Sequence, residues 1–208
     1  RVEGEPLPPT SVRARPVPLR AFAPKGRGDR LGRPLDATRA LVEWFEAYFQ
    51  VPYPYAKLDL IAVPDHLGAM ENAGAIIYDD QLLLLEPDPP AGQLQSFAVV
   101  HAHELAHQWF GNLVTPVFWD DIWLNEAFAT WVSYRAVNAT MPELGLERRT
   151  QLGALGAMAP DSLPSARRVR EPIATEADIG DAFDGITYRK GGGLLSMVEG
   201  YLGRERLQ

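Results

Sequence analysis

Two histidines stand four residues apart in a strongly apolar stretch of this chain, with a glutamate beside the first of them: His103, Glu104 and His107. Residues four apart share one face of an α-helix, so the two imidazoles could bind one metal ion and the glutamate could reach a water held there. Burying such polar groups is costly unless they have partners. The alternatives to a metal site are that the run arose by chance or that the two histidines form a buried structural pair. The run therefore favours a fold that packs a metal-binding helix inside its core.

A third metal ligand is expected from the next helical stretch, because a catalytic zinc ion usually has three protein ligands and one open position. Glu126 is an acid in an otherwise apolar segment, and eighteen residues (108–125) separate it from His107. That spacing leaves room for a loop and the first turn of a returning helix. An exposed glutamate is the ordinary alternative. His101 competes as a ligand, but a residue two positions before His103 points to another side of a helix, so we interpret it as supporting or structural.

The composition narrows the choice of metal ligands and of partners. The 208 residues include no cysteine, which excludes thiolate ligands and disulfides. We therefore predict one Zn²⁺ per chain, held by His103, His107 and Glu126. The net charge of −7 and the lack of a basic stripe argue against nucleic acid as a partner. No apolar run is long enough for a membrane span, so no membrane segment is expected. A cytoplasmic protein and an exported one both fit the sequence.

The apolar patterning predicts strands first and helices second. Strands are expected at 17–23, 57–63 and 75–78, and the apolar segment 81–85 could pair in the same sheet. Helices are expected from a cap at Asp36 to just before Pro52, and then over about 91–110, 122–140, a stretch ending near 159, and 188–202. This order predicts an α+β domain with a small mixed sheet followed by a helical half.

Four sequence blocks occur together in an informative order. Gly68–Asn72 reads GAMEN, His103–Thr115 reads HELAHQWFGNLVT, Trp119–Thr130 reads WDDIWLNEAFAT, and Tyr188–Gly191 reads YRKG. In this order and at these spacings, the blocks resemble the zinc aminopeptidases of the aminopeptidase N, or alanyl aminopeptidase, type, which are gluzincins. The resemblance covers about residues 17–208 and is far more specific than any one block.

The resemblance implies a role for each residue of these blocks. His103, His107 and Glu126 would bind zinc, Glu104 would act as general base and then as acid, and Tyr188 would stabilise the oxyanion. Glu71 would hold the free α-amino group of the substrate. Gly68 and Ala69 would align the peptide, and Met70 and Asn72 complete this substrate-binding segment. Ala73 stands where many members of the family have Trp, which would reshape the first side-chain pocket.

The resemblance also implies a thermolysin-like, or zincin, catalytic domain placed between an N-terminal β domain and C-terminal helical domains. We therefore expect residues 1–16 to be a linker from an N-terminal β domain outside this sequence. Residues 17–208 would be the catalytic domain without the C-terminal helical domain. Such a segment should expose an apolar face where other domains dock, and it should be only weakly active by itself.

Other functions remain open beside the expected hydrolysis of the N-terminal peptide bond of peptides with a free N-terminus. A thermolysin-like endopeptidase would share the zinc site but would not need the GAMEN segment. An epoxide activity like that of the leukotriene hydrolase branch usually goes with GGMEN, whereas residue 69 is Ala here. A fragment that only binds zinc and peptide would not need every catalytic residue to be present.

Overall fold

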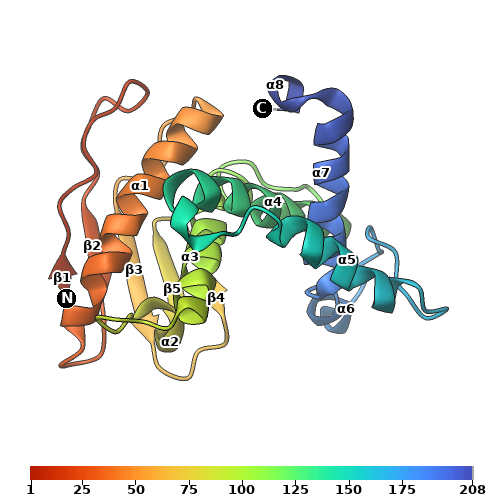
Figure 1. The fold of residues 1–208 in the computed structure, drawn as a ribbon, viewed down its shortest axis with the longest axis horizontal. Coiled ribbons are helices and arrows are strands. Elements are labelled where there is room, and N and C mark those ends of the chain that lie inside the picture. The colour runs from red at the N-terminus through yellow and green to blue at the C-terminus, as the bar shows by residue number, and fades with distance from the viewer. Residues whose placement is uncertain (208) are drawn as a thin grey trace.

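The computed structural model describes residues 1–207 and contains a sheet in its N-terminal half and helices in its C-terminal half (Figure 1). The five strands are β1 (Val2–Glu3), β2 (Leu19–Phe22), β3 (Leu58–Val63), β4 (Ala69–Met70) and β5 (Ala75–Asp79), in the spatial order β1-β2-β3-β5-β4. The three central strands are parallel, with Leu60 opposite both Ala21 and Ile76, and each outer strand pairs antiparallel. This arrangement confirms the predicted small mixed sheet and the strands expected around β2, β3 and β5.

Eight α-helices follow or flank the sheet in the described residues: α1 (Gly32–Phe49), α2 (Asp80–Leu83), α3 (Ala91–Ala106), α4 (Ile122–Thr140), α5 (Arg149–Asp161), α6 (Glu176–Asp181), α7 (Gly191–Leu202) and α8 (Arg204–Leu207). Helices α1 and α3 pack together beside the sheet, and α4 crosses from them to α7 (Figure 1). The α+β class and the helical second half are thus confirmed. Within residues 1–207, no helix has the length and apolar character needed to cross a membrane.

Helix α1 packs its apolar stripe into the core. Leu41, Val42 and Phe45 recur at helical spacing and are fully buried. The helix ends at Phe49 because Gln50 adopts a left-handed conformation, with φ 54°. The predicted start at Asp36 is wrong. The turn at Gly28–Leu31 leads directly into the helix, which begins at Gly32 and places Asp36 inside it.

The segment 81–85 forms no strand, contrary to our expectation. The side chain of Asp79 accepts a hydrogen bond from the backbone N–H of Gln81, and this cap turns the end of β5 into the short helix α2. Leu83, Leu84 and Leu85 are still buried, as the apolar pattern required. A run of apolar residues this short fits a buried helical turn as well as a strand.

Residues 1–16, expected to be a linker, lie packed against this domain. β1 pairs with β2, and the buried Leu7 exchanges backbone hydrogen bonds with Val17. The buried guanidinium of Arg13 donates to the buried carboxylate of Glu46 on α1, with Nε 2.6 Å from Oε1. This ion pair ties the N-terminal segment to the core. The position of the domain boundary stays a prediction.

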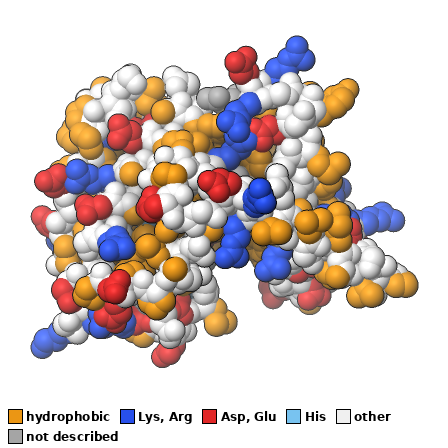
Figure 2. Space-filling view, in the orientation of Figure 1, with side chains coloured by type: hydrophobic (Ala, Val, Ile, Leu, Met, Phe, Trp, Pro, Cys, Tyr) orange, Lys and Arg blue, Asp and Glu red, His pale blue; other side chains and the backbone are white. Residues whose placement is uncertain are grey.

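A patch of apolar side chains is exposed on the helical half, as expected from the sequence. Leu152, Leu155 and Met158 on α5 and Met197 and Tyr201 on α7 are each more than half exposed. Figure 2 shows hydrophobic side chains gathered in this region of the surface. That other domains dock here stays a prediction.

Replacing Glu46 with Ala should lower the free energy of unfolding by about 3–5 kcal/mol, because Arg13 would remain buried without its partner. Urea unfolding followed by circular dichroism measures this change. Glu43 is an exposed glutamate on the same helix, so Glu43→Ala is the matched control and should change stability by less than about 0.5 kcal/mol. Similar small effects of both substitutions would contradict a structural role for the buried pair.

Candidate active site

Three side chains from two helices meet at one point. His103 and His107 come from the C-terminal end of α3, and Glu126 lies near the start of α4. His103 Nε2 is 3.0 Å from Glu126 Oε2 and 3.0 Å from His107 Nε2, and His107 Nε2 is 3.5 Å from Glu126 Oε2. Bonds of about 2.0–2.1 Å in a tetrahedral zinc site put ligand atoms about 3.3 Å apart. The predicted convergence is confirmed, and these residues could hold a metal ion.

The charges at this point also suit a cation. Burial opposes a charged imidazole, but the hydrogen bond and charge of Glu126, with the charges of Glu71 and Glu104, outweigh it and raise the pKa of His107 to about 9. Burial alone would raise the pKa of Glu126, yet the hydrogen bonds to His103 and His107 lower it. Burial lowers the pKa of His103 despite its hydrogen bond to Glu126. A positive charge is therefore stabilised here, and a metal ion could replace the proton on His107.

The remaining ring nitrogens of the two histidines are also engaged. His107 Nδ1 lies 3.1 Å from the Phe110 carbonyl oxygen, which can only accept, so Nδ1 donates and leaves Nε2 free to bind a metal. Thr130 Oγ1 of α4 lies 3.4 Å from His103 Nδ1. Gly111 has φ 127°, and a Cβ there would lie 2.5 Å from Asn125 Oδ1 and 2.9 Å from His107 Nδ1. Only glycine fits where the loop passes this close to the ligand.

Glu104 has the environment expected of a general base. Its side chain is buried, and its Oε2 atom has no hydrogen-bond partner among the described residues. Burial, together with the charges of Glu71 and Glu126, raises the pKa of this carboxyl to about 8, although His107 acts in the opposite direction. A buried carboxylate oxygen without a partner is costly. Such an oxygen is suited to accept a hydrogen bond or a proton from a water.

Tyr188 lies beside the three converging side chains. It belongs to a turn of π-helix, Ile186–Lys190, which leads into α7, whereas we expected an α-helix from Tyr188 onward. The Tyr188 and His103 rings lie 5.9 Å apart between centroids. Burial raises the pKa of the Tyr188 hydroxyl, and the charges of Glu126, Glu104 and Glu71 add to the effect. The hydroxyl therefore stays protonated and can donate a hydrogen bond.

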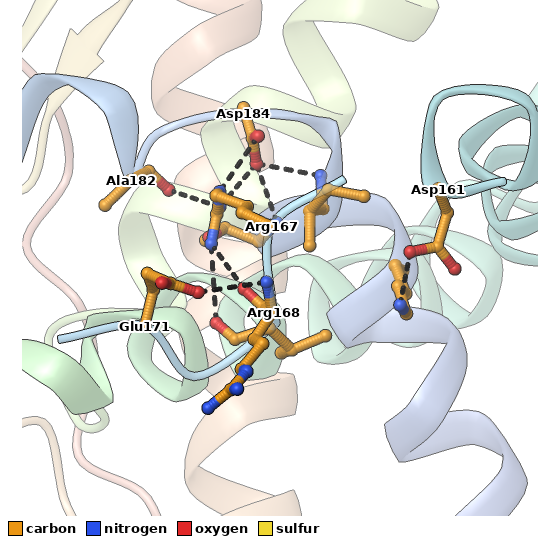
Figure 3. A network of polar contacts seen from close by, with 10 residues as sticks. Asp161, Arg167, Arg168, Glu171, Ala182 and Asp184 are labelled. Atoms are coloured by element: carbon orange, nitrogen blue, oxygen red, sulfur yellow. Dashed lines mark hydrogen bonds and ion pairs between the residues drawn. The ribbon is translucent and has the colours of Figure 1, made fainter. Parts of the chain in front are cut away.

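An arginine and an aspartate that our sequence analysis did not identify hold the turn of Tyr188. Asp184 Oδ1 accepts from the backbone N–H groups of Ile186 and Thr187, at 2.8 and 3.1 Å. Arg167 binds the same carboxylate through Nε and Nη2, at 3.0 and 2.5 Å, and also donates to Thr187 Oγ1 (Figure 3). Asp184 just before a helical start was a possible capping signal. Nothing in the sequence pairs it with Arg167.

The GAMEN segment runs along the edge of the sheet. Ala69 and Met70 form β4, and Gly68 accepts a hydrogen bond from the N–H of Asp79 through its carbonyl oxygen. Glu71 follows and is half-buried, and its charge contributes to the pKa of Glu104 and Tyr188 described above. Asn72 is exposed, and its carbonyl oxygen accepts the N–H of Ala75 in the turn that follows.

The structure also contains a pocket beside Glu71 and a third histidine on α3, His101. A pocket of about 340 Å³ lies beside Glu71 and is lined also by Gly111, Val117 and Asn125. His101 is fully buried and bonded on both sides, with Nε2 2.9 Å from Thr38 Oγ1 and Nδ1 2.8 Å from the Tyr78 hydroxyl. Burial lowers its pKa to about 3, so it is neutral. These contacts agree with the interpretation of His101 as a supporting or structural residue.

The fold and the site define a class: an α+β domain in which two histidines of one helix and a glutamate of the next could hold one metal ion. Residues 33–208 match the Peptidase family M1 domain. The chain therefore belongs to peptidase family M1, a family of metallopeptidases, and the resemblance inferred from the four sequence blocks is confirmed.

Curated relatives agree with this assignment. The chain is 41% identical to endoplasmic reticulum aminopeptidase 2 of Homo sapiens over 194 residues, which are 92% of this chain and 20% of that protein. It is 40% identical to aminopeptidase M1 of Arabidopsis thaliana over 92% of this chain and 22% of that protein. It is also 40% identical to probable aminopeptidase 1 of Saccharolobus solfataricus, over 84% and 22% of the two chains. The chain thus spans about a fifth of the length of these relatives.

Replacing Gly111 with Ala should weaken the binding of Zn²⁺ by about 10–100-fold, because the added Cβ would displace His107 or Asn125. Competition with a chromophoric chelator measures the affinity. Gly92→Ala is the matched control, since a Cβ at Gly92, in the first turn of α3, meets no atom of the described residues within 4 Å. Wild-type affinity in Gly111→Ala would mean that the close approach does not position the ligand.

Proposed function

We propose that this chain is the catalytic part of a zinc aminopeptidase that hydrolyses the N-terminal peptide bond of peptides with a free N-terminus. The observation that carries the proposal is the convergence of His103, His107 and Glu126 beside the buried carboxylate of Glu104, one oxygen of which has no hydrogen-bond partner within residues 1–207. The relatives named as aminopeptidases support the same activity. No thiolate is available, and two imidazoles with one carboxylate form a ligand set typical of catalytic zinc.

His103, His107 and Glu126 would hold the ion, which when bound would acidify a water and polarise the scissile carbonyl. Glu104 would accept a proton from the attacking water and deliver it to the leaving amine. Burial raises the pKa of Glu104 towards the neutral range, which suits a group that both accepts and releases a proton. The neutral hydroxyl of Tyr188 would donate to the oxygen on which charge develops.

Glu71 would limit the enzyme to the first peptide bond. A carboxylate at the end of β4 attracts the substrate ammonium, and the charge of Glu71 already acts on Glu104 and Tyr188. An ammonium held there would place the first peptide bond over the metal ligands. An endopeptidase would have no use for this carboxylate, so its position favours the exopeptidase.

The same proposal extends to the whole protein. We propose that residues 17–208 act as the catalytic domain beside further domains of one longer enzyme. By itself, this segment would be weakly active, because an ammonium in an open and wet site is held weakly by one carboxylate. The exposed apolar patch on α5 and α7 supports contact with further protein.

The proposal is tested by metal analysis of the full-length enzyme together with cleavage of a matched pair of peptides. One zinc per chain and cleavage of the free peptide at its first bond are expected, with at least about a hundredfold loss of kcat/KM when the N-terminus is acetylated. The physical reason is that acetylation removes the ammonium, and with it the charge-assisted hydrogen bonds to the Glu71 carboxylate. Equal cleavage of both peptides would instead identify an endopeptidase.

Replacing Glu104 with Gln should reduce kcat of the full-length enzyme by about 10²–10⁴-fold and leave zinc content unchanged, because proton transfer is lost while the ligands remain. Metal content by atomic emission and steady-state kinetics at neutral pH measure the two effects. Glu147→Gln, a change at an exposed glutamate in the helical half, is the control and should leave both values unchanged. A Glu104→Gln enzyme with near-normal kcat would disprove the assigned role.

A further inference from the structure

Gln108 directly follows the ligand His107 and reaches the loop that carries Glu71. Its side chain is fully buried, and both ends of its amide are used. Nε2 donates to the backbone carbonyl of Glu71 at 3.0 Å, and Oε1 accepts from the backbone N–H of Gly74 at 2.9 Å. Asn112 Nδ2 donates to the same Glu71 carbonyl at 2.7 Å. We call these contacts of Gln108 and Asn112 with residues 71–74 the amide clamp.

The amide clamp connects two parts of the fold that are held in place by different contacts. Residues 71–74 follow the two-residue edge strand β4 and are attached to the sheet through β5 and through Lys57, whose Nζ donates to the Gly74 carbonyl at 2.8 Å. The metal ligands belong instead to the packed helices α3 and α4. A small shift between sheet edge and helices would therefore change the distance from Glu71 to the ligands.

We propose that Gln108, with Asn112, is a positioning residue that fixes the Glu71 carboxylate at the distance from the metal ligands required for cleavage after the first residue. This inference rests on the proposed aminopeptidase function and adds a specificity-determining role for residues outside the metal and proton-transfer sets. The clamp acts on the backbone of Glu71, and it leaves the carboxylate itself free for an ammonium.

The chemistry of the clamp explains why an amide is needed at position 108. The Glu71 carbonyl requires a donor and the Gly74 N–H requires an acceptor, and one buried amide supplies both. Met at this position would have similar length but could make neither contact, which leaves the Gly74 N–H without its acceptor and the Glu71 carbonyl with one donor fewer, the Asn112 amide remaining. The loop would then move to find water, and Glu71 would move with it. Displacements of about 1 Å in a positioning group can reduce rates by about a hundredfold.

The test measures how much the substrate ammonium contributes to binding. Alanine hydroxamate and N-acetylalanine hydroxamate both present a metal-binding group, and only the first carries an ammonium. Isothermal titration of the zinc-loaded full-length enzyme gives the dissociation constant of each probe. The ratio compared below is the constant of the acetylated probe divided by that of the free amine. We expect Gln108→Met to reduce this ratio by about 10–100-fold, with KM for a free peptide raised more than kcat is lowered. Affinity for the acetylated probe and zinc content should stay unchanged.

Three further variants separate positioning from general support. Gln95→Met is the matched control, because Gln95 at the other end of α3 donates to the Leu144 carbonyl at 2.9 Å, and it should leave the ratio unchanged. Asn112→Ala removes one bond of the clamp from a half-buried residue, so it should reduce the ratio by about three- to tenfold even if Gln108→Met folds poorly. In a Glu71→Gln background, Gln108→Met should have no further effect on the ratio.

The outcomes distinguish this inference from the function on which it rests. A wild-type enzyme that binds both probes equally would overturn the amine anchor and the clamp together. A wild-type enzyme that prefers the free amine, combined with clamp variants that retain this preference, would overturn the clamp alone. Equal weakening of both probes, or an undiminished effect in the Glu71→Gln background, would also overturn it, since the clamp would then support the metal-binding helix in general.

Discussion

The packing of α3 against α4 is the contact on which the rest of the site depends. Neither helix holds the ligand set by itself, because α3 provides two imidazoles and α4 provides Glu126. Close contacts on both sides fix the approach: Gly111 passes against His107 and Asn125, and Thr130 reaches His103. The packing of α7 on α4 also depends on a close approach. A Cβ at Gly191 would lie 2.7 Å from the Ala127 Cβ, so only glycine allows α7 to pack this tightly on α4 and bring Tyr188 beside the ligands.

The site combines three acidic side chains whose charges repel one another unless a cation is bound. Glu71 and Glu126 both act on Glu104, all three acids act on His107, and the carboxyl groups of Glu104 and Glu126 are buried. Burial, with repulsion from Glu71 and Glu126, keeps the pKa of Glu104 high, while hydrogen bonds to the histidines keep the pKa of Glu126 low. One carboxyl is thus ready to exchange a proton and another is ready to bind a cation. A divalent ion would relieve the repulsion, so its binding would also stabilise the folded state.

The sequence allowed the convergence of the candidate metal-binding residues and the main elements to be predicted because these signals are local. Two histidines at helical spacing and an acid in an apolar helix define the ligand set without knowledge of the fold. Interactions between distant segments could not be predicted in this way. Arg167 with Asp184, and Gln108 with Gly74, are polar pairs that look like ordinary loop and helix residues until the chain is folded. Local competition also explains the errors at Asp36 and 81–85, where a preceding turn and the Asp79 cap decided the structure.

The division of labour between sheet and helices has a consequence for specificity. The groups that would carry out hydrolysis lie on helices and their ends. The group that would bind the N-terminal ammonium of the substrate, Glu71, lies at the edge of the sheet. In the proposed aminopeptidase, restriction to the first peptide bond would then depend on a distance between two layers of the fold more than on any one side chain. Neighbouring positions such as Ala73 could change the side-chain pocket without altering that distance, because the backbone of residues 71–74 is fixed by hydrogen bonds to Gln108, Asn112 and Lys57. Under the proposed function, selectivity for the first residue and restriction to the first bond would therefore be separable properties of this fold.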